Sequence, residues 1–337
     1  MIYEEESTNK SMRKHPEVLG ILLTEKCNIA CRHCCNDSHP SRSGSVGFDK
    51  IAKLIDDAKT VPSIREIGIS GGEPFLFPDL LHQVVAYARD RSYSSSITTN
   101  GFWGRSTAMG AHLERLKREG LRAICISSSI FHQEFLAPER LRAALAMALN
   151  HDLAVTINVV ETAGYGRADI ERLLIDYRGR FDIAPMPVLP SGRAKLEAHP
   201  EEFGARTPTP FGSCRKHFSK LAIDASGDAY PCCSPGGFTP PLRLGNVHSI
   251  GVEAATAAAE NNRVLAVLED VGPGFFLPFL RASGRPGLPE AFSDQCHLCH
   301  TMLSDPNLAQ IASAAADQLF EEFQQAARQH AKGEVNG

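Results

Sequence analysis

The chain has 337 residues, of which 43% are hydrophobic and 22% are charged, and its formal net charge is -4. These values suit a globular protein with room for a barrel-sized domain and a smaller unit, and they exclude a strong electrostatic attraction to nucleic acid or to a membrane surface. The acidic start lacks the features of a signal peptide, and no apolar run is long enough to span a bilayer. We therefore expect a cytoplasmic protein with neither nucleic acid nor membrane as a partner.

Short β-type segments alternate with helical segments from residue 18 to about residue 190. The predicted strands are Val18–Thr24, Arg65–Ser70, Ser95–Thr99, Arg122–Ser127, Leu153–Val160 and Phe181–Met186. Apolar residues at helical spacing predict helices over Asp49–Lys59, Asp79–Arg89, Thr107–Glu119, Pro138–Asn150 and Ala168–Tyr177. This order predicts the α/β class and a partial (β/α)6, TIM-like barrel over residues 18–195, after an N-terminal tail of residues 1–17. In such barrels the chemistry gathers at the carboxyl ends of the strands.

The alternation ends in a proline-rich stretch over residues 185–210. Two short runs on either side of Ala225–Asp228 then predict a β-hairpin, and loops rich in glycine and proline follow. We expect residues 196–304 to form a small extension built on this hairpin. Apolar residues recur at helical spacing from Asn307 to Lys332, which predicts a C-terminal helix within a final segment over residues 305–337.

Ten cysteines in a protein of the reducing cytosol favour metal binding over disulfides. The first group, Cys27, Cys31 and Cys34, has the spacing C-x3-C-x2-C and follows the first predicted strand. Three thiolates leave one iron of a [4Fe-4S] cluster open to a substrate or cofactor. The alternatives are three unrelated buried cysteines or a zinc knuckle, for which no nearby cysteine pair completes the four ligands.

This cysteine loop resembles that of the radical S-adenosylmethionine (SAM) superfamily. The resemblance implies that the open iron chelates SAM and that reductive cleavage of SAM gives a 5'-deoxyadenosyl radical. Gly71-Gly72-Glu73-Pro74 resembles the family motif that contacts the methionyl part of SAM. The resemblance also implies that His33 contacts adenine and that the ribose or carboxylate is contacted by Asn100, Ser127 and Asn158. Taken alone, such a motif or a polar residue at a strand end is more often a simple turn.

A second cysteine group lies beyond the predicted barrel. Cys214, Cys232, Cys296 and Cys299 supply four thiolates, enough to saturate an auxiliary [4Fe-4S] cluster. The pattern resembles the twitch or SPASM-like extension of some radical SAM enzymes. Zinc could take the same four ligands. Cys296-His297-Leu298-Cys299-His300 also matches the haem-attachment signature C-x-x-C-H, but that attachment goes with export, and we expect neither histidine to be a ligand.

Cys233 follows Cys232 directly and belongs to neither group. Neighbouring residues of a strand point to opposite faces, so Cys233 faces the barrel if Cys232 faces the auxiliary cluster. A thiol in that position can give a hydrogen atom to a carbon radical. The alternative is a small buried hydrophobic residue, which is also what we expect of Cys35 and Cys125.

Several motifs together resemble the radical SAM peptide epimerases, natural-product enzymes that convert L-residues of a ribosomal peptide to D-residues. They are Cys31–Cys35, Asn100–Gly104, Tyr230–Pro235 and Cys296–Cys299. In that family the second cysteine of the later pair donates hydrogen, which implies that Cys233 is the catalytic donor. The chain differs in two respects: Ser127–His132 lacks the family's aspartate, and we expect no leader-binding domain before Val18.

The sequence therefore predicts a radical SAM enzyme that uses SAM and two [4Fe-4S] clusters to epimerise a peptide. A reductase or a flavodoxin-type protein is the expected electron donor. The main alternative is a sulfur-inserting or rearranging enzyme that acts on a small molecule such as a nucleoside or a sugar. The remote alternative is a zinc-binding or electron-transfer module without catalysis.

Overall fold

A curved sheet of nine strands forms the centre of the computed structural model, in the order β6-β5-β4-β3-β2-β1-β7-β8-β9. The structure describes residues 15–204, 206–208, 212–214, 218–234 and 236–334. The first six strands are Val18–Leu22, Glu66–Ser70, Ser94–Thr99, Leu121–Ser128, Ala154–Glu161 and Asp182–Pro187, and all are parallel. Because β6 and β9 are the two ends of the order, the sheet is not closed, and the predicted partial barrel is confirmed.

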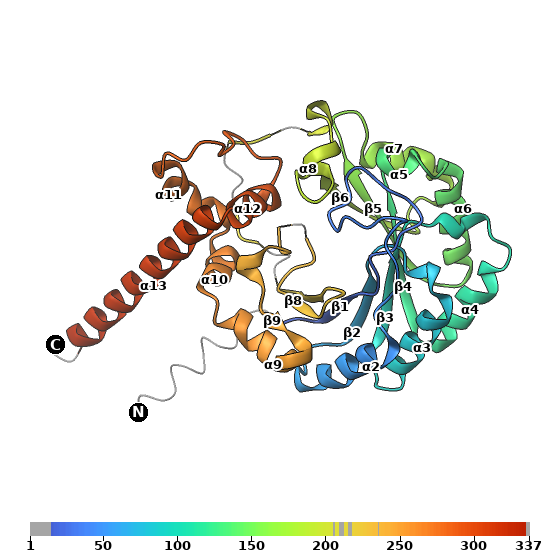
Figure 1. Ribbon diagram of the computed structural model, residues 1–337, viewed down its shortest axis with the longest axis horizontal. Coiled ribbons are helices and arrows are strands. Elements are labelled where there is room, and N and C mark those ends of the chain that lie inside the picture. The colour runs from blue at the N-terminus through green and yellow to red at the C-terminus, as the bar shows by residue number, and fades with distance from the viewer. Residues whose placement is uncertain (1–14, 205, 209–211, 215–217, 235, 335–337) are drawn as a thin grey trace.

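Helices connect these strands along the outer side of the sheet (Figure 1). They are α2 Phe48–Asp57, α3 Pro78–Arg89, α4 Met109–Glu119, α5 Ile130–Gln133, α6 Pro138–Asn150 and α7 Arg167–Leu173. Each long helix buries one apolar stripe; in α2, for example, Ile51, Leu54 and Ile55 are buried. The helices predicted from apolar spacing all occur, with small shifts at their ends. The short α5, which follows β4, was not predicted.

The two faces of the barrel strands differ in side-chain size. In β4, Ile124 and Ile126 are buried against the helices, whereas Cys125 and Ser127 alternate with them and face the lumen. Residues in register with these lumen positions are small: Gly20, Gly68, Ser96, Thr98, Ala123 and Thr156. The lumen is therefore lined by small, mostly polar side chains instead of the large branched residues that fill a closed barrel.

The predicted hairpin occurs as β7 Lys220–Ile223 and β8 Asp228–Tyr230, and the two-residue strand β9 Gly245–Asn246 pairs with β8. The Asp224 carboxylate accepts hydrogen bonds from the backbone N–H groups of Ser226 and Asp228, which closes the turn. Strand β7 pairs in parallel with β1, with Lys220 opposite Val18. The hairpin thus continues the sheet of the barrel, an arrangement that the sequence analysis did not anticipate.

A group of helices follows the hairpin. They are α9 Val247–Glu260, α10 Arg263–Asp270, α11 Leu277–Ala282, α12 Gln295–Ser304 and α13 Pro306–Glu334, and the short α8 Ala194–Glu197 precedes the hairpin. Of these, only α13 was predicted, because the others are short or, like α9, interrupted by a glycine at positive φ (Gly251, φ 83°). The far part of α13 extends past the rest of the molecule (Figure 1), which leaves Phe323 66% exposed. None of the helices in the described ranges has the length and apolarity that a membrane span requires.

Candidate functional site

The three cysteines of the first group lie on the loop that follows β1. Cys27 and Cys31 are buried and Cys34 is half-buried. Burial raises the pKa of the Cys27 and Cys31 thiols, and Cys34 raises both further, so the three thiols are electrostatic neighbours. Such thiols lose their protons when a metal binds, because the positive charge of the metal stabilises the thiolate.

A single metal ion and a cluster need different arrangements of their donor atoms. Within the described ranges, the sole group of three ligand atoms all within 4.8 Å of one another comes from Cys31, His33 and His132. Sulfurs that share one tetrahedral zinc lie about 3.8 Å apart, given Zn–S bonds of about 2.3 Å. Cys27, Cys31 and Cys34 do not form such a group, and three thiolates on separate irons are what a cluster with one open iron requires.

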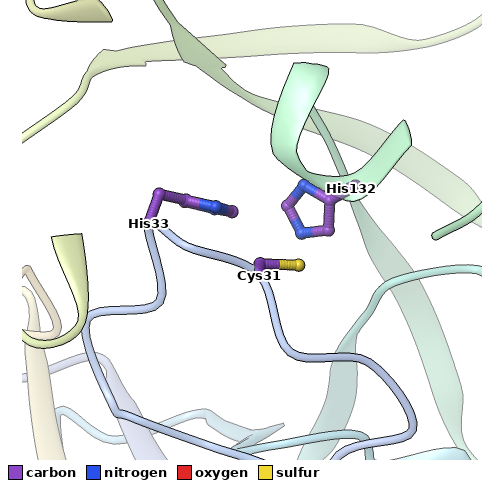
Figure 2. Close-up of side chains that lie close together, drawn as sticks. All are labelled: Cys31, His33 and His132. Carbon is purple, nitrogen blue, oxygen red and sulfur yellow. The ribbon is translucent and has the colours of Figure 1, made fainter. Parts of the chain in front are cut away.

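Two imidazole rings meet the Cys31 side chain, one from the loop and one from α5, as Figure 2 shows. His33 stacks on Phe131 at a centroid distance of 4.7 Å and meets His132 edge-on at 4.8 Å. Burial lowers the pKa of His33 and lowers that of His132 to about 4, so both rings are neutral near pH 7. The Nδ1 atom of His33 is buried and has no hydrogen-bond partner among the described residues. A buried polar atom of this kind indicates a site built to take a bound group.

Ser129 fixes the ring of His132, because its Oγ lies 2.8 Å from Nδ1 of that ring. The sequence analysis placed His33 at this site. It gave no role to His132, because only the helical turn of α5 brings that ring back to the cysteine loop.

Gly71 and Gly72 let two backbone segments approach closely. The N–H of Gly72 donates to the Thr24 carbonyl at 2.6 Å, and the N–H of Glu73 donates to the Lys26 carbonyl at 2.9 Å. Gly71 has φ 129°, and a Cβ added to Gly72 would lie 2.0 Å from the Lys26 oxygen. The glycine pair therefore fixes the segment that leads directly into Cys27.

Glu73 is 0% exposed, and its carboxylate joins the ends of β2 and β3. It accepts hydrogen bonds from the backbone N–H of Asn100 at 2.7 Å, from the Thr99 hydroxyl at 2.8 Å and from the backbone N–H of Phe75 at 3.0 Å. Burial raises its pKa to about 7 in spite of these three donors. Pro74, also buried, begins the short turn that follows. The side chain of Glu73 thus forms its hydrogen bonds within the protein, to the end of β3 and to the turn after the motif.

The three polar residues assigned to SAM contacts lie at the carboxyl ends of neighbouring strands. The Asn100 amide donates to the Asn28 side chain at 2.8 Å and lies 3.7 Å from the Cys27 sulfur. Ser127 and Asn158 are directly opposite each other in the pairing of β4 with β5, on the lumen side. The fold therefore brings all three to the edge of the sheet where the cysteine loop lies.

The second cysteine group comes together from three separate segments. Cys214 precedes β7, Cys232 follows β8, and Cys296 and Cys299 are three residues apart on α12, which places them on one helix face. Burial raises the pKa of Cys232 to about 12 and that of Cys299 well above its ordinary value. Cys214 and Cys296 add to both shifts, so the four thiols are electrostatic neighbours.

The two histidines beside this group have contacts of their own. His297 is buried against Phe292, and its Nδ1 accepts a hydrogen bond from the Ser293 backbone at 3.1 Å. The nearer ring nitrogen of His300, Nδ1, lies 3.0 Å from the Ser304 hydroxyl.

Cys233 lies toward the lumen, near Cys125 on the lumen side of β4. The pKa of Cys125 is raised mainly by burial, and Cys233 adds to this shift, as it also does to that of its neighbour Cys232. Cys233 and Cys35 are exposed and Cys125 is half-buried. The expectation that Cys35 is a small buried hydrophobic residue is therefore wrong.

Comparisons with known proteins identify the barrel. Residues 21–170 match the family model described as the Radical SAM superfamily. This part of the chain is a radical SAM domain. The chain is similar to YydG of Bacillus subtilis (strain 168), named as a peptide biosynthesis protein, with 23% identity over 86% of this chain and 92% of the relative. It is also similar to a GTP 3',8-cyclase of Streptomyces coelicolor, with 31% identity over 50% of this chain and 53% of the relative.

Among solved structures, the chain is similar to BtrN in complex with AdoMet and 2-DOIA. The TM-score is 0.48 and the identity is 16%, over 78% of this chain and 91% of the other. The match of residues 21–170 to the family model, and not this likeness, supports a radical SAM enzyme that uses SAM and one [4Fe-4S] cluster. When bound, this pair supplies a 5'-deoxyadenosyl radical. Cys27, Cys31 and Cys34 are the residues that would hold the cluster, since they have the donor atoms and the spacing it needs.

Gly72→Ala tests the close approach of the two backbones. The added methyl group would overlap the Lys26 carbonyl and displace the segment before Cys27, at a cost of about 1–3 kcal/mol or more. We expect the variant to lose about four irons per chain on anaerobic reconstitution. The matched control is Gly164→Ala, because a Cβ there would meet no atom within 4 Å. A Gly72→Ala protein with the parent's iron content and SAM binding would contradict this interpretation.

Glu73 predicts a pH dependence of stability. Its folded-state pKa, about 7, lies above the ordinary 4.5, so folding favours the protonated acid and stability falls as the pH rises through 7. Between pH 6 and pH 8 the free energy of unfolding should fall by about 1.4 kcal/mol through this group. Glu73→Gln should be less stable at pH 6 and should lack this fall. Urea denaturation at both pH values measures the free energy of unfolding. An equal decrease between pH 6 and pH 8 in the parent and in the variant would refute the assignment.

Proposed function

We propose that the enzyme epimerises an L-residue of a ribosomal peptide to the D-residue, with Cys233 as the hydrogen donor. The position of Cys233 carries this proposal: it faces the lumen, while its neighbour Cys232 faces the second cysteine group. Similarity to YydG, a protein named for peptide biosynthesis, extends over 86% of the chain and therefore beyond the radical SAM domain. Similarity to the Streptomyces GTP 3',8-cyclase covers only 50% of the chain.

The second cysteine group is best suited to an auxiliary [4Fe-4S] cluster. Four thiolates from Cys214, Cys232, Cys296 and Cys299 would saturate it and leave no iron open. Zinc could take the same four thiolates, and metal analysis distinguishes the two sites. Gly237 makes room for this arrangement, because a Cβ there would lie 2.7 Å from the Cβ of Cys232.

In the proposed reaction, one side of the substrate faces the cysteine loop and the opposite side faces Cys233. The substrate loses a hydrogen atom from Cα at the side of the cysteine loop, which leaves a planar carbon radical. The bound SAM and cluster would supply the radical that takes this atom, and 5'-deoxyadenosine would carry it away. The Cys233 S–H then gives a hydrogen atom from the opposite side, which forms the inverted Cα–H bond and leaves a thiyl radical. One electron and one proton restore the thiol. We assign that electron to the group held by the auxiliary cysteines, with a reductase or flavodoxin-type protein as its source.

The two cysteine groups should bind iron independently. Reconstituted parent protein should hold about eight irons, and the Cys27→Ala/Cys31→Ala/Cys34→Ala variant about four. With dithionite and SAM, the parent should release 5'-deoxyadenosine and the triple variant should release none. Iron analysis, zinc analysis and chromatography of the nucleoside products measure these outcomes. About four irons in the parent, with zinc in place of the rest, would remove the auxiliary cluster from the proposal.

Cys233→Ala tests the hydrogen donor. In D2O the Cys233 thiol carries deuterium, so each turnover of the parent should place one deuterium on the inverted carbon. The variant should keep both clusters and cleave SAM, yet yield no D-residue. Co-expression with short peptides encoded beside the gene, followed by hydrolysis, chiral amino-acid analysis and mass spectrometry, gives the readout.

Cys125→Ala is the matched control for this experiment, because Cys125 also faces the lumen but has no assigned role. It should epimerise and incorporate deuterium as the parent does. Deuterated D-product from Cys233→Ala at the parent's rate would refute the donor role. A product that is heavier by one sulfur, or a small-molecule substrate, would instead support the sulfur-inserting or rearranging alternative.

A further inference from the structure

The buried guanidinium of Arg193, which follows the last barrel strand, binds the cysteine loop at several points. Arg193, just after β6, is 9% exposed, and its Nε donates to the Cys31 carbonyl at 2.9 Å. Its Nη2 donates to the Ser38 carbonyl at 2.9 Å, and its Nη1 forms an ion pair with Asp37 at 3.0 Å. Three nitrogens of one rigid, planar group thus bind three points of the loop.

The backbone beside Arg193 completes this contact. The N–H of Arg193 donates to the Cys34 carbonyl at 3.0 Å. Gly192 has φ 53°, and a Cβ there would lie 2.4 Å from the Cys34 oxygen and 2.6 Å from the Cys35 oxygen. Only glycine allows the segment that follows β6 to lie this close to the loop.

The loop contains a turn at Asp37 that this arginine can hold. Asp37 has φ 50°, a left-handed conformation that few residues other than glycine, asparagine and aspartate adopt. The ion pair with Arg193 stabilises this turn. Arg32, the other arginine of the loop, cannot replace Arg193, because its side chain bonds Glu134 and Glu202.

We infer that Arg193 is a positioning residue for the radical SAM cluster. It fixes the carbonyls of Cys31 and Cys34 and thereby sets where two of the three thiolates point. Its charge lies next to Cys31, and a nearby cation favours the more negative, reduced form of a cluster. This inference rests on the radical SAM domain alone and holds whether or not the substrate is a peptide.

Arg193→Gln and Arg193→Lys separate the two effects, since lysine keeps the charge but cannot donate in three directions. We expect the midpoint potential of the SAM-responsive cluster to fall in Arg193→Gln and to stay near the parent's value in Arg193→Lys. Both variants should bind iron at the cysteine loop and cleave SAM about tenfold less well. EPR-monitored potentiometry with and without SAM identifies this cluster, because only a cluster with an open iron responds to SAM.

A measurement on the full chain before reconstitution tests the loop itself. Backbone amides of residues 31–38 should exchange with D2O faster in both Arg193 variants than in the parent. Arg42→Ala is the matched control, because Arg42 pairs with the other carboxylate oxygen of Asp37 at 3.2 Å but is about half exposed, so its loss should change neither readout. Parent-like exchange and potential in Arg193→Gln would overturn the inference. Equal loss of both clusters would also overturn it, since the residue would then support the whole fold instead of this loop.

Discussion

The buried carboxylate of Glu73 is the constraint on which the site depends. Its oxygens accept hydrogen bonds from Thr99 and Asn100 at the end of β3, and its own backbone N–H donates to Lys26, just before the first cysteine. The Thr99 hydroxyl that donates to Glu73 also accepts from the indole N–H of Trp103 at 3.0 Å. The side chain of Asn100 extends this hydrogen-bond network to Asn28, which is next to Cys27. A shift of this carboxylate would therefore move the glycine turn, the end of β3 and the cysteine loop together.

Strand pairing then sorts the cysteines between two environments. Alternation along β4 places Cys125 in the lumen, and the chain that follows β8 brings Cys233 near Cys125 and Cys232 near Cys214 and Cys296. The lumen carries small side chains and thiols that no metal site claims, whereas the far side carries four thiols set for a shared ligand. A protein that uses radicals benefits from this separation, because a thiol bound to iron cannot donate a hydrogen atom.

Much of this arrangement could be predicted from the sequence. Periodicity identified the six barrel strands and their helices, and cysteine spacing identified the loop after β1, because both signals are local. The pairing of β7 with β1 left no such signal, since parallel pairing depends on residues far apart in the chain. The contacts of Arg193 with a loop more than 150 residues away were invisible for the same reason. Helices α10 to α12 are too short for their apolar pattern to stand out from the glycine- and proline-rich surroundings.

The place of β1 in the middle of the sheet has a consequence for how the chain folds. One edge of β1 pairs with β2 soon after both are made, but its other edge pairs with β7, which leaves the ribosome much later. Until then that edge offers unpaired N–H and C=O groups, the feature through which partly folded chains associate. The first strand thus stays exposed to chaperones and to other nascent chains until the hairpin arrives. Docking of the hairpin therefore both completes the pairing of β1 and places Cys232 of the second cysteine group beside the barrel.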